Sequence, residues 1–71
     1  MNPRYFASED RLALYRLRLL RSWVGEYRRG GTWVVSEDVV RRYWNGFDAD
    51  VREFTEEQAM DLMAELDRRK T

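Results

Sequence analysis

The stretch from Ser8 to Arg29 restricts the fold of this chain more than any other part of its sequence. It contains no proline, it is rich in residues that favour helices, and it stops at Gly30-Gly31, a pair typical of a helix C-terminus. At its start, Ser8-Glu9-Asp10 is typical of a helix N-cap followed by acidic residues in the first turn. The pattern therefore predicts one long helix.

Helical spacing, with residues about 100° apart, gives this stretch an apolar sector and a basic sector. The apolar sector contains Leu12, Ala13, Tyr15, Leu17, Leu19, Leu20, Trp23, Val24 and Tyr27, and the basic sector contains Arg11, Arg18, Arg21, Arg28 and Arg29. Arg16 is the exception, because it projects into the apolar sector. Three explanations stay open for it: its charged end reaches solvent, it pairs with an acid of the C-terminal half, or this sector contacts a partner protein.

A second, shorter helix is predicted from Ser36 to Asn45. Ser36 is a suitable N-cap and Asn45-Gly46 is a suitable C-terminal stop. The apolar residues between them fall on one helical face: Val39, Val40, Tyr43 and Trp44. A strand is the alternative, because Val, Tyr and Trp favour sheets and Asn-Gly is typical of tight hairpins. The helical spacing is the better match.

A third helix is predicted from Thr55, which forms a capping box with Gln58. Two short β-prone stretches, 32–35 and 51–54, flank the central helix and could pair as a ribbon. We therefore expect residues 1–71 to form a single all-α domain of three helices, with or without a minimal two-stranded β ribbon. The alternative is an α+β arrangement of helix, hairpin and helix. The expected centre of the core is aromatic: Trp23, Trp33, Trp44, Phe47 and Phe54.

The residue types present exclude several kinds of chemistry. The chain has neither Cys nor His, so it cannot form a disulfide, a thiolate or imidazole metal site, or a catalytic pair that needs His. Asp48 and Asp50 are close in sequence, but so short a chain has little material for a cleft that excludes water, so we interpret them as loop charges. No apolar run approaches the roughly 20 residues of a membrane span. We expect a cytoplasmic, non-enzymatic protein with no cofactor and no metal.

Charge is distributed unevenly along the sequence. The chain has 13 basic and 13 acidic residues, but its first 35 residues carry seven basic and three acidic ones, so the two halves have opposite net charge. Such a chain neutralises itself or pairs with a charged partner. All basic residues except Lys70 are arginine, which is typical of genes with high GC content, often those of phages or mobile elements. Arginine also suits the bidentate contacts of protein interfaces.

The tripeptide Leu14-Tyr15-Arg16 resembles the signature of the LYR-motif proteins. That family comprises small three-helix adaptors that engage acyl carrier protein and assist mitochondrial complex assembly or iron–sulfur biogenesis, and Phe47 is similar to its downstream Phe. The resemblance would give Arg16 the role of reaching into a partner's ligand. This chain departs from the family at Arg18, where an apolar residue is usual, and in its short central helix. We therefore base no family assignment on the resemblance.

The function that these patterns favour is a small adaptor or regulator that docks on another protein, or on a second copy of itself. The expected contact residues are Arg16, Arg18, Arg21, Trp23, Tyr27, Arg28 and Arg29. One alternative is a DNA-binding regulator that uses the basic sector, or Arg41 and Arg42 of the central helix. The other is a structural subunit of a larger assembly. A net charge of zero disfavours the DNA-binding alternative, and we expect no membrane partner.

Overall fold

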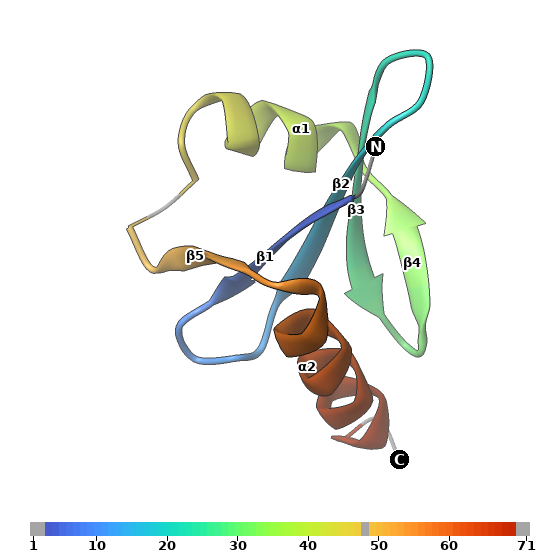
Figure 1. The fold of residues 1–71 in the computed structure, drawn as a ribbon, viewed down its shortest axis with the longest axis vertical. Helices are drawn as coiled ribbons and strands as arrows, with labels where there is room; N and C mark the ends of the chain where they lie inside the picture. The colour runs from blue at the N-terminus through green and yellow to red at the C-terminus, as the bar shows by residue number, and fades with distance from the viewer. Residues whose placement is uncertain (1–2, 48, 70–71) are drawn as a thin grey trace.

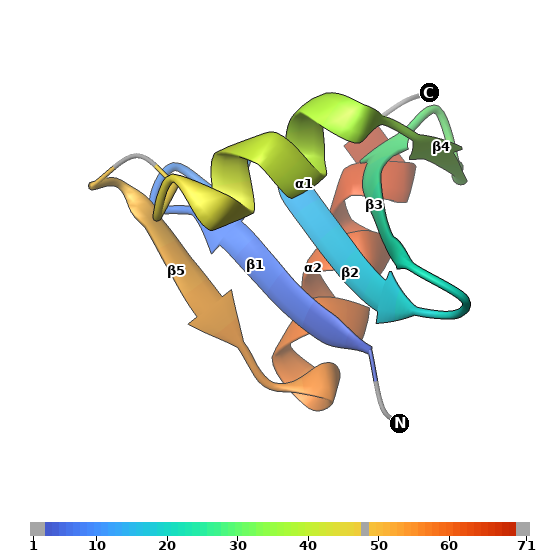
Figure 2. The same ribbon diagram turned by 90° about the horizontal axis from the view of Figure 1, so that it is seen from above.

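A computed structural model describes residues 3–47 and 49–69 of the chain. These residues form β1 (Arg4–Ser8), β2 (Leu14–Leu19), β3 (Trp23–Arg29), β4 (Thr32–Val35), α1 (Glu37–Trp44), β5 (Val51–Phe54) and α2 (Glu56–Arg69). The strands form one antiparallel sheet in the order β4-β3-β2-β1-β5. The helices lie on opposite faces of that sheet (Figures 1 and 2). The expected all-α, three-helix domain is therefore wrong, because the fold is dominated by a sheet.

The span predicted as a single long helix, residues 8–29, contains the end of β1, all of β2 and all of β3. Successive side chains of a strand point to opposite faces, so β2 places Leu17 on the face that α1 covers and Arg16 and Arg18 on the face that α2 covers. With this period of two, Arg16 lies on the same face as Arg18 and opposite Leu17, so it is no longer a charged exception within an apolar sector. Because Leu14-Tyr15-Arg16 lies in an extended strand, it also lacks the helical setting of the family that it resembles.

The residues that were interpreted as a helix N-cap stabilise the turn between β1 and β2 instead. The carboxylate of Asp10 accepts hydrogen bonds from the Ser8 hydroxyl (2.6 Å) and from the Leu12 N–H (3.0 Å), and the Ser8 hydroxyl accepts one from Ala13 N–H (3.1 Å). These bonds lower the pKa of Asp10 below its ordinary value, with the Ser8 hydroxyl contributing most. Ser and Asp favour turns for the same reason that they favour caps, because their short side chains bond nearby backbone groups.

The two glycines that were interpreted as a helix stop form the hairpin between β3 and β4. Gly30 and Gly31 have φ values of +61° and +80°, and Arg29 pairs directly with Thr32 across the turn. A two-residue turn with both central φ values positive matches the twist of the strands that it joins, and glycine adopts it without a steric penalty.

The two other predicted helices are confirmed. Helix α1 follows Ser36 and ends before Asn45. Helix α2 begins with a reciprocal capping box, in which Thr55 N–H donates to Gln58 Oε1 (2.9 Å) and Gln58 N–H donates to Thr55 Oγ1 (3.1 Å). The stretches 32–35 and 51–54 are strands, as their composition favoured, but they lie at opposite edges of the sheet and do not form a ribbon together. Neither helix combines the length and the apolar character needed to traverse a bilayer.

Each helix covers its own apolar layer. On the α2 face, the buried residues are Tyr5, Ala7, Leu14, Ala59 and Leu62, with Trp33, Phe54, Met63 and Leu66 packed around them. On the α1 face, Phe6, Leu17 and Val39 are buried next to a group of aromatic rings formed by Tyr15, Trp23, Tyr43 and Phe47. The predicted aromatic centre is wrong for Trp44, which is 65% exposed, and the other four lie on two separate faces.

Candidate protein-binding surface

The seven residues predicted to contact a partner are divided between two faces and a turn. The pair Arg16–Glu26 on neighbouring strands fixes the orientation of β2 relative to β3. By strand alternation, the α2 face carries Arg16, Arg18 and Arg28, the α1 face carries Trp23, Tyr27 and Arg29, and Arg21 lies in the turn between β2 and β3. No one surface therefore brings all seven together.

A buried carboxylate holds two of these arginines. Glu26 is only 4% exposed, and its Oε1 accepts hydrogen bonds from the Nε of Arg16 (2.9 Å) and the Nε of Arg18 (2.8 Å). A further bond joins Arg18 Nη2 to Oε2 (3.2 Å). Burial alone would raise the pKa of Glu26, but the hydrogen bonds and positive charges of Arg16 and Arg18 outweigh it and lower the pKa below its ordinary value. Glu26 is therefore an ionised, fully paired structural group.

Two guanidinium groups lie close to the ring of Trp33 in β4. The Cζ of Arg16 is 4.2 Å from the centroid of the Trp33 ring, and the Cζ of Arg28 is 5.4 Å from it, both within the range of cation–π attraction. Arg28 also donates to both carboxylate oxygens of Asp67 in α2 (3.1 and 2.7 Å) and to the carbonyl of Gly31 (2.9 Å). Arg28 thus connects the C-terminal helix to the β3–β4 hairpin, which is a structural role.

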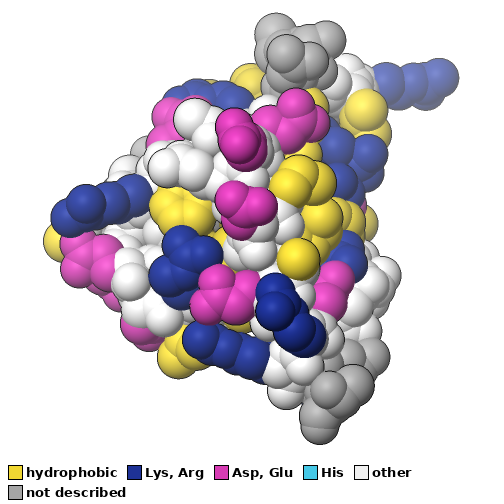
Figure 3. All heavy atoms as spheres, turned by 60° about the horizontal axis from the view of Figure 1, so that its bottom comes forward, with side chains coloured by type: hydrophobic (Ala, Val, Ile, Leu, Met, Phe, Trp, Pro, Cys, Tyr) yellow, Lys and Arg dark blue, Asp and Glu magenta, His cyan; other side chains and the backbone are white. Residues whose placement is uncertain are grey.

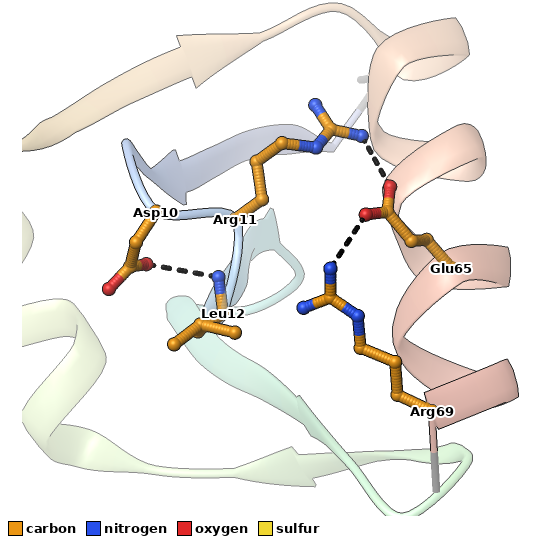
Figure 4. A network of polar contacts seen from close by, with 5 residues as sticks. All are labelled: Asp10, Arg11, Leu12, Glu65 and Arg69. Carbon is orange, nitrogen blue, oxygen red and sulfur yellow. Dashed lines mark hydrogen bonds and ion pairs between the residues drawn. The ribbon is translucent and has the colours of Figure 1, made fainter.

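Ion pairs between the two halves of the chain cancel the charge asymmetry of the sequence. Arg4 pairs with Glu53, Arg11 with Glu65, and Arg28 with Asp67. Figure 4 shows Glu65 of α2 receiving Arg11 from the β1–β2 turn and Arg69 from its own helix. The hydrogen bonds from Arg4 and Arg11 are the largest causes of the lowered pKa of Glu53 and of Glu65. Figure 3 accordingly shows basic and acidic side chains interspersed on the face that it presents.

The two arginines of the alternative DNA-binding helix project differently. Arg41 is exposed and lies 3.7 Å from Asp38 one turn earlier. Arg42 is half-buried, donates to the hydroxyl of Tyr15 (3.3 Å) and lies over the Tyr15 ring at 5.3 Å. Asp48 lies outside the described residues, and Asp50 is exposed with its carbonyl accepting from Glu9 N–H (2.7 Å), which is a loop contact.

Exposed apolar side chains lie at and beside the β2–β3 turn. This turn is at the upper right of Figure 1. We call this surface the hairpin-end patch: Leu19, Leu20, Arg21 and Trp23. Leu20 is 62% exposed and Leu19 is 38% exposed. Trp23 lines a hollow of about 220 Å³, whose other walls are Ser22, Val24, Gly25, Val35, Ser36, Glu37 and Val40. The patch contains Arg21 and Trp23, which are two of the seven predicted contact residues, whereas Arg18 lies on the α2 face.

Sequence reasoning missed Glu26 and Trp33, which organise the arginines of β2 and β3. It also placed Leu19 and Leu20 in the apolar sector of a helix, whereas they lie at an exposed hairpin end. The alternation from Tyr15 to Leu19, apolar at odd positions and basic at Arg16 and Arg18, is the signal that could have found this arrangement.

Comparison of the chain with protein-family models, with curated proteins and with solved structures gives no match. The geometry of the described residues is therefore the basis for the proposals that follow.

Proposed function

We propose that this chain is a non-enzymatic protein-interaction module, a small cytoplasmic adaptor or regulator that docks on a partner protein through the hairpin-end patch. The supporting observation is the exposure of Leu19 and Leu20 beside Trp23 and its hollow. Large apolar side chains that gather on one exposed surface are typical of protein-binding sites, and aromatic residues and arginine are enriched in such sites.

The charges around the patch indicate the chemistry of the partner. Arg21 is exposed in the turn, and the side chain of Arg18 is 38% exposed although it bonds Glu26. A partner segment with apolar side chains for the leucines and an acidic residue for Arg21 would complement this surface. Trp23 and the leucines beside it would supply the apolar contacts of the interface, and the charges would set the orientation of the partner.

A matched pair of substitutions tests the proposal. Leu20→Glu places a charge in the patch, and Leu12→Glu places the same charge at a residue of similar exposure (64%) in the β1–β2 turn, at the opposite end of the sheet. Proteins that the native chain retains from an extract of its source cells are purified and titrated against all three chains. We expect Leu20→Glu to weaken binding by at least about tenfold and Leu12→Glu to leave it unchanged. If no purified candidate binds in a way that depends on Leu20, the proposal is wrong.

The DNA-binding regulator and the structural subunit stay predictions. Protein binding is favoured over DNA binding because Arg16, Arg18 and Arg28 already bond carboxylates of the same chain. DNA phosphates would have to compete with these carboxylates for the guanidinium groups.

A further inference from the structure

The outer edge of β4 differs from the edge at the other side of the sheet. The four residues of β4, Thr-Trp-Val-Val, carry no charge and are all strong β formers. The opposite edge, β5, carries Arg52 and Glu53, which form ion pairs with Glu9 and Arg4. Proteins commonly protect exposed sheet edges with charged side chains, because an unprotected edge pairs with another strand. β4 lacks that protection.

The hydrogen-bond pattern shows which backbone groups this edge presents. Ser36 N–H donates to the carbonyl of Gly25 (2.8 Å), and the register pairs Val34 with Tyr27 and Thr32 with Arg29. In an antiparallel ladder, hydrogen-bonded pairs alternate with non-hydrogen-bonded pairs, so the N–H and C=O groups of Thr32 and Val34 point toward β3. The N–H and C=O groups of Trp33 and Val35 therefore point outward along the edge.

We propose that β4 pairs antiparallel with β4 of a second copy of this chain, with the two-fold axis at Val34. This register places Trp33 opposite Val35 of the second copy, so that all outward groups of both strands meet without involving the turn or α1. A register centred on Trp33 or on Val35 would pair one outward residue with the Gly30-Gly31 turn or with Glu37, which begins α1. The two sheets would join into one continuous sheet of ten strands.

The side chains of this edge fit a second copy of the same strand. Trp33 and Val35 lie on the α2 face, where Val35 is 65% exposed, so the proposed register creates two aromatic–β-branched pairs across the axis. On the other face, Val34 meets its own counterpart. Helix α1 packs on β3 and β2, so it does not run along the outer side of β4.

Charge complementarity supports the antiparallel orientation. An antiparallel pair brings the start of one β4 beside the end of the other. Arg29, next to the turn before β4, and Glu37, just after β4, are both exposed and opposite in sign. The two-fold axis would bring each Arg29 toward Glu37 of the second copy, twice in the dimer. Leu20 lies in the β2–β3 turn and not in β4. Val35 and Glu37 also line the hollow beside Trp23, so the two proposed surfaces adjoin there and are distinguished by Leu20.

Two substitutions of Val35 test the dimer in the full-length chain. Val35→Lys puts a charge opposite Trp33 of the second copy, and Val35→Pro removes an outward N–H that makes no bond within the sheet. Val51→Pro is the control, because it removes an outward N–H from the other edge of the sheet. Glu9 N–H donates to the Asp50 carbonyl (2.7 Å), so by the same alternation the N–H of the next residue, Val51, points away from β1. Circular dichroism of each variant verifies that it is folded.

Sedimentation equilibrium measures the mass, and hydrogen exchange measures protection of individual amides. We expect a native mass of twice 8.6 kDa, protected Trp33 and Val35 amides, and a dimer dissociation constant at least about tenfold higher for both Val35 variants but not for Val51→Pro. A native chain that stays monomeric at millimolar concentration would overturn the proposal. So would a dimer that survives both Val35 substitutions, or one in which the Trp33 and Val35 amides exchange rapidly. Because Leu20→Glu does not touch β4, its effect on partner binding separates this proposal from the preceding one.

Discussion

Replacing Gly25 with alanine is expected to force α1 away from the sheet. A Cβ atom on Gly25 would lie 2.8 Å from Val39 Cβ, 2.9 Å from Val40 Cγ2 and 2.9 Å from the backbone nitrogen of Val40. Ordinary contacts between carbon atoms are about 3.5–4.0 Å, so the helix would have to move by roughly 1 Å. A side chain could rotate away from the new methyl group, but a Cβ atom and a backbone nitrogen cannot move without the helix.

The expected cost follows from two opposing effects. Overpacking a well-filled interior usually costs about 1–3 kcal/mol. Alanine in place of glycine restricts the unfolded chain and returns about 0.4–1 kcal/mol. With the middle of each range, the net loss in the free energy of unfolding is about 1.3 kcal/mol, which lowers the Tm of a domain of this size by roughly 5–10 °C.

Urea unfolding followed by tryptophan fluorescence, and thermal unfolding followed by circular dichroism, measure this loss. Gly46→Ala is the control for backbone strain alone, because Gly46 has φ +83° and a Cβ there would have no heavy atom of the described residues within 4 Å. Only Gly25→Ala should shift the amide resonances of Val39 and Val40, because Gly46 bonds the carbonyl of Tyr43 at the other end of α1 (2.9 Å). A Gly25→Ala chain that is as stable as the native one would show that α1 does not approach the sheet closely at this point.

Three further predictions concern charge, capping and nucleic acid. Glu26→Gln should lower the free energy of unfolding by about 1–3 kcal/mol in urea titrations, because it leaves Arg16 and Arg18 without their shared carboxylate; an unchanged midpoint would contradict the pairing. The pKa of Glu26 is lowered in the folded chain, so ionised Glu26 stabilises the fold above the ordinary pKa of 4.5. This stabilisation is lost as the pH falls through the folded pKa, so the native chain should lose more stability on acidification than Glu26→Gln. Thr55→Ala should cost about 1 kcal/mol by removing the acceptor for Gln58 N–H, and an equal Tm would contradict the cap. A duplex DNA titration at low salt should show no binding, and a steep, log-linear salt dependence of any binding observed would instead favour the DNA-binding alternative.

The helices after residue 35 could be predicted from the sequence because their signals are local. Thr55 and Gln58 bond each other within one turn of the chain. Ser36 marks the start of α1, where its carbonyl accepts from Val39 N–H (3.2 Å), although its side chain makes no cap hydrogen bond. The β-prone character of 32–35 and 51–54 was also visible. Their positions at opposite edges could not be predicted, because β5 pairs with β1, which is more than 40 residues earlier in the sequence (Ser8 with Val51, Tyr5 with Phe54).

The first 29 residues were misinterpreted because two periodicities coexist in them. Leucine and arginine favour helices. In a sequence with so many apolar residues, most of them fall within a broad sector of a helix even when the chain is not helical. The alternation around Arg16 and Arg18 has a period of two, and Arg16 was interpreted as an exception when it was the strand signal. Gly30-Gly31 is compatible with a helix end and with a hairpin, and the choice between them depends on that periodicity. Glu26 could not be recognised as a partner before the register was known.

The order of the strands in the sheet bears on how the chain reaches its native state during synthesis. β1 leaves the ribosome first, yet its second neighbour, β5, and the helix that covers Tyr5, Ala7 and Leu14 are made last. Until residue 54 emerges, the nascent four-stranded meander exposes one side of β1 and an uncovered apolar layer, which are features that favour aggregation. Closing the sheet then requires residues 5–8 to pair with residues 51–54, and contacts between segments so far apart in sequence slow folding. Co-translational folding of this small protein should therefore complete only when its last helix is available.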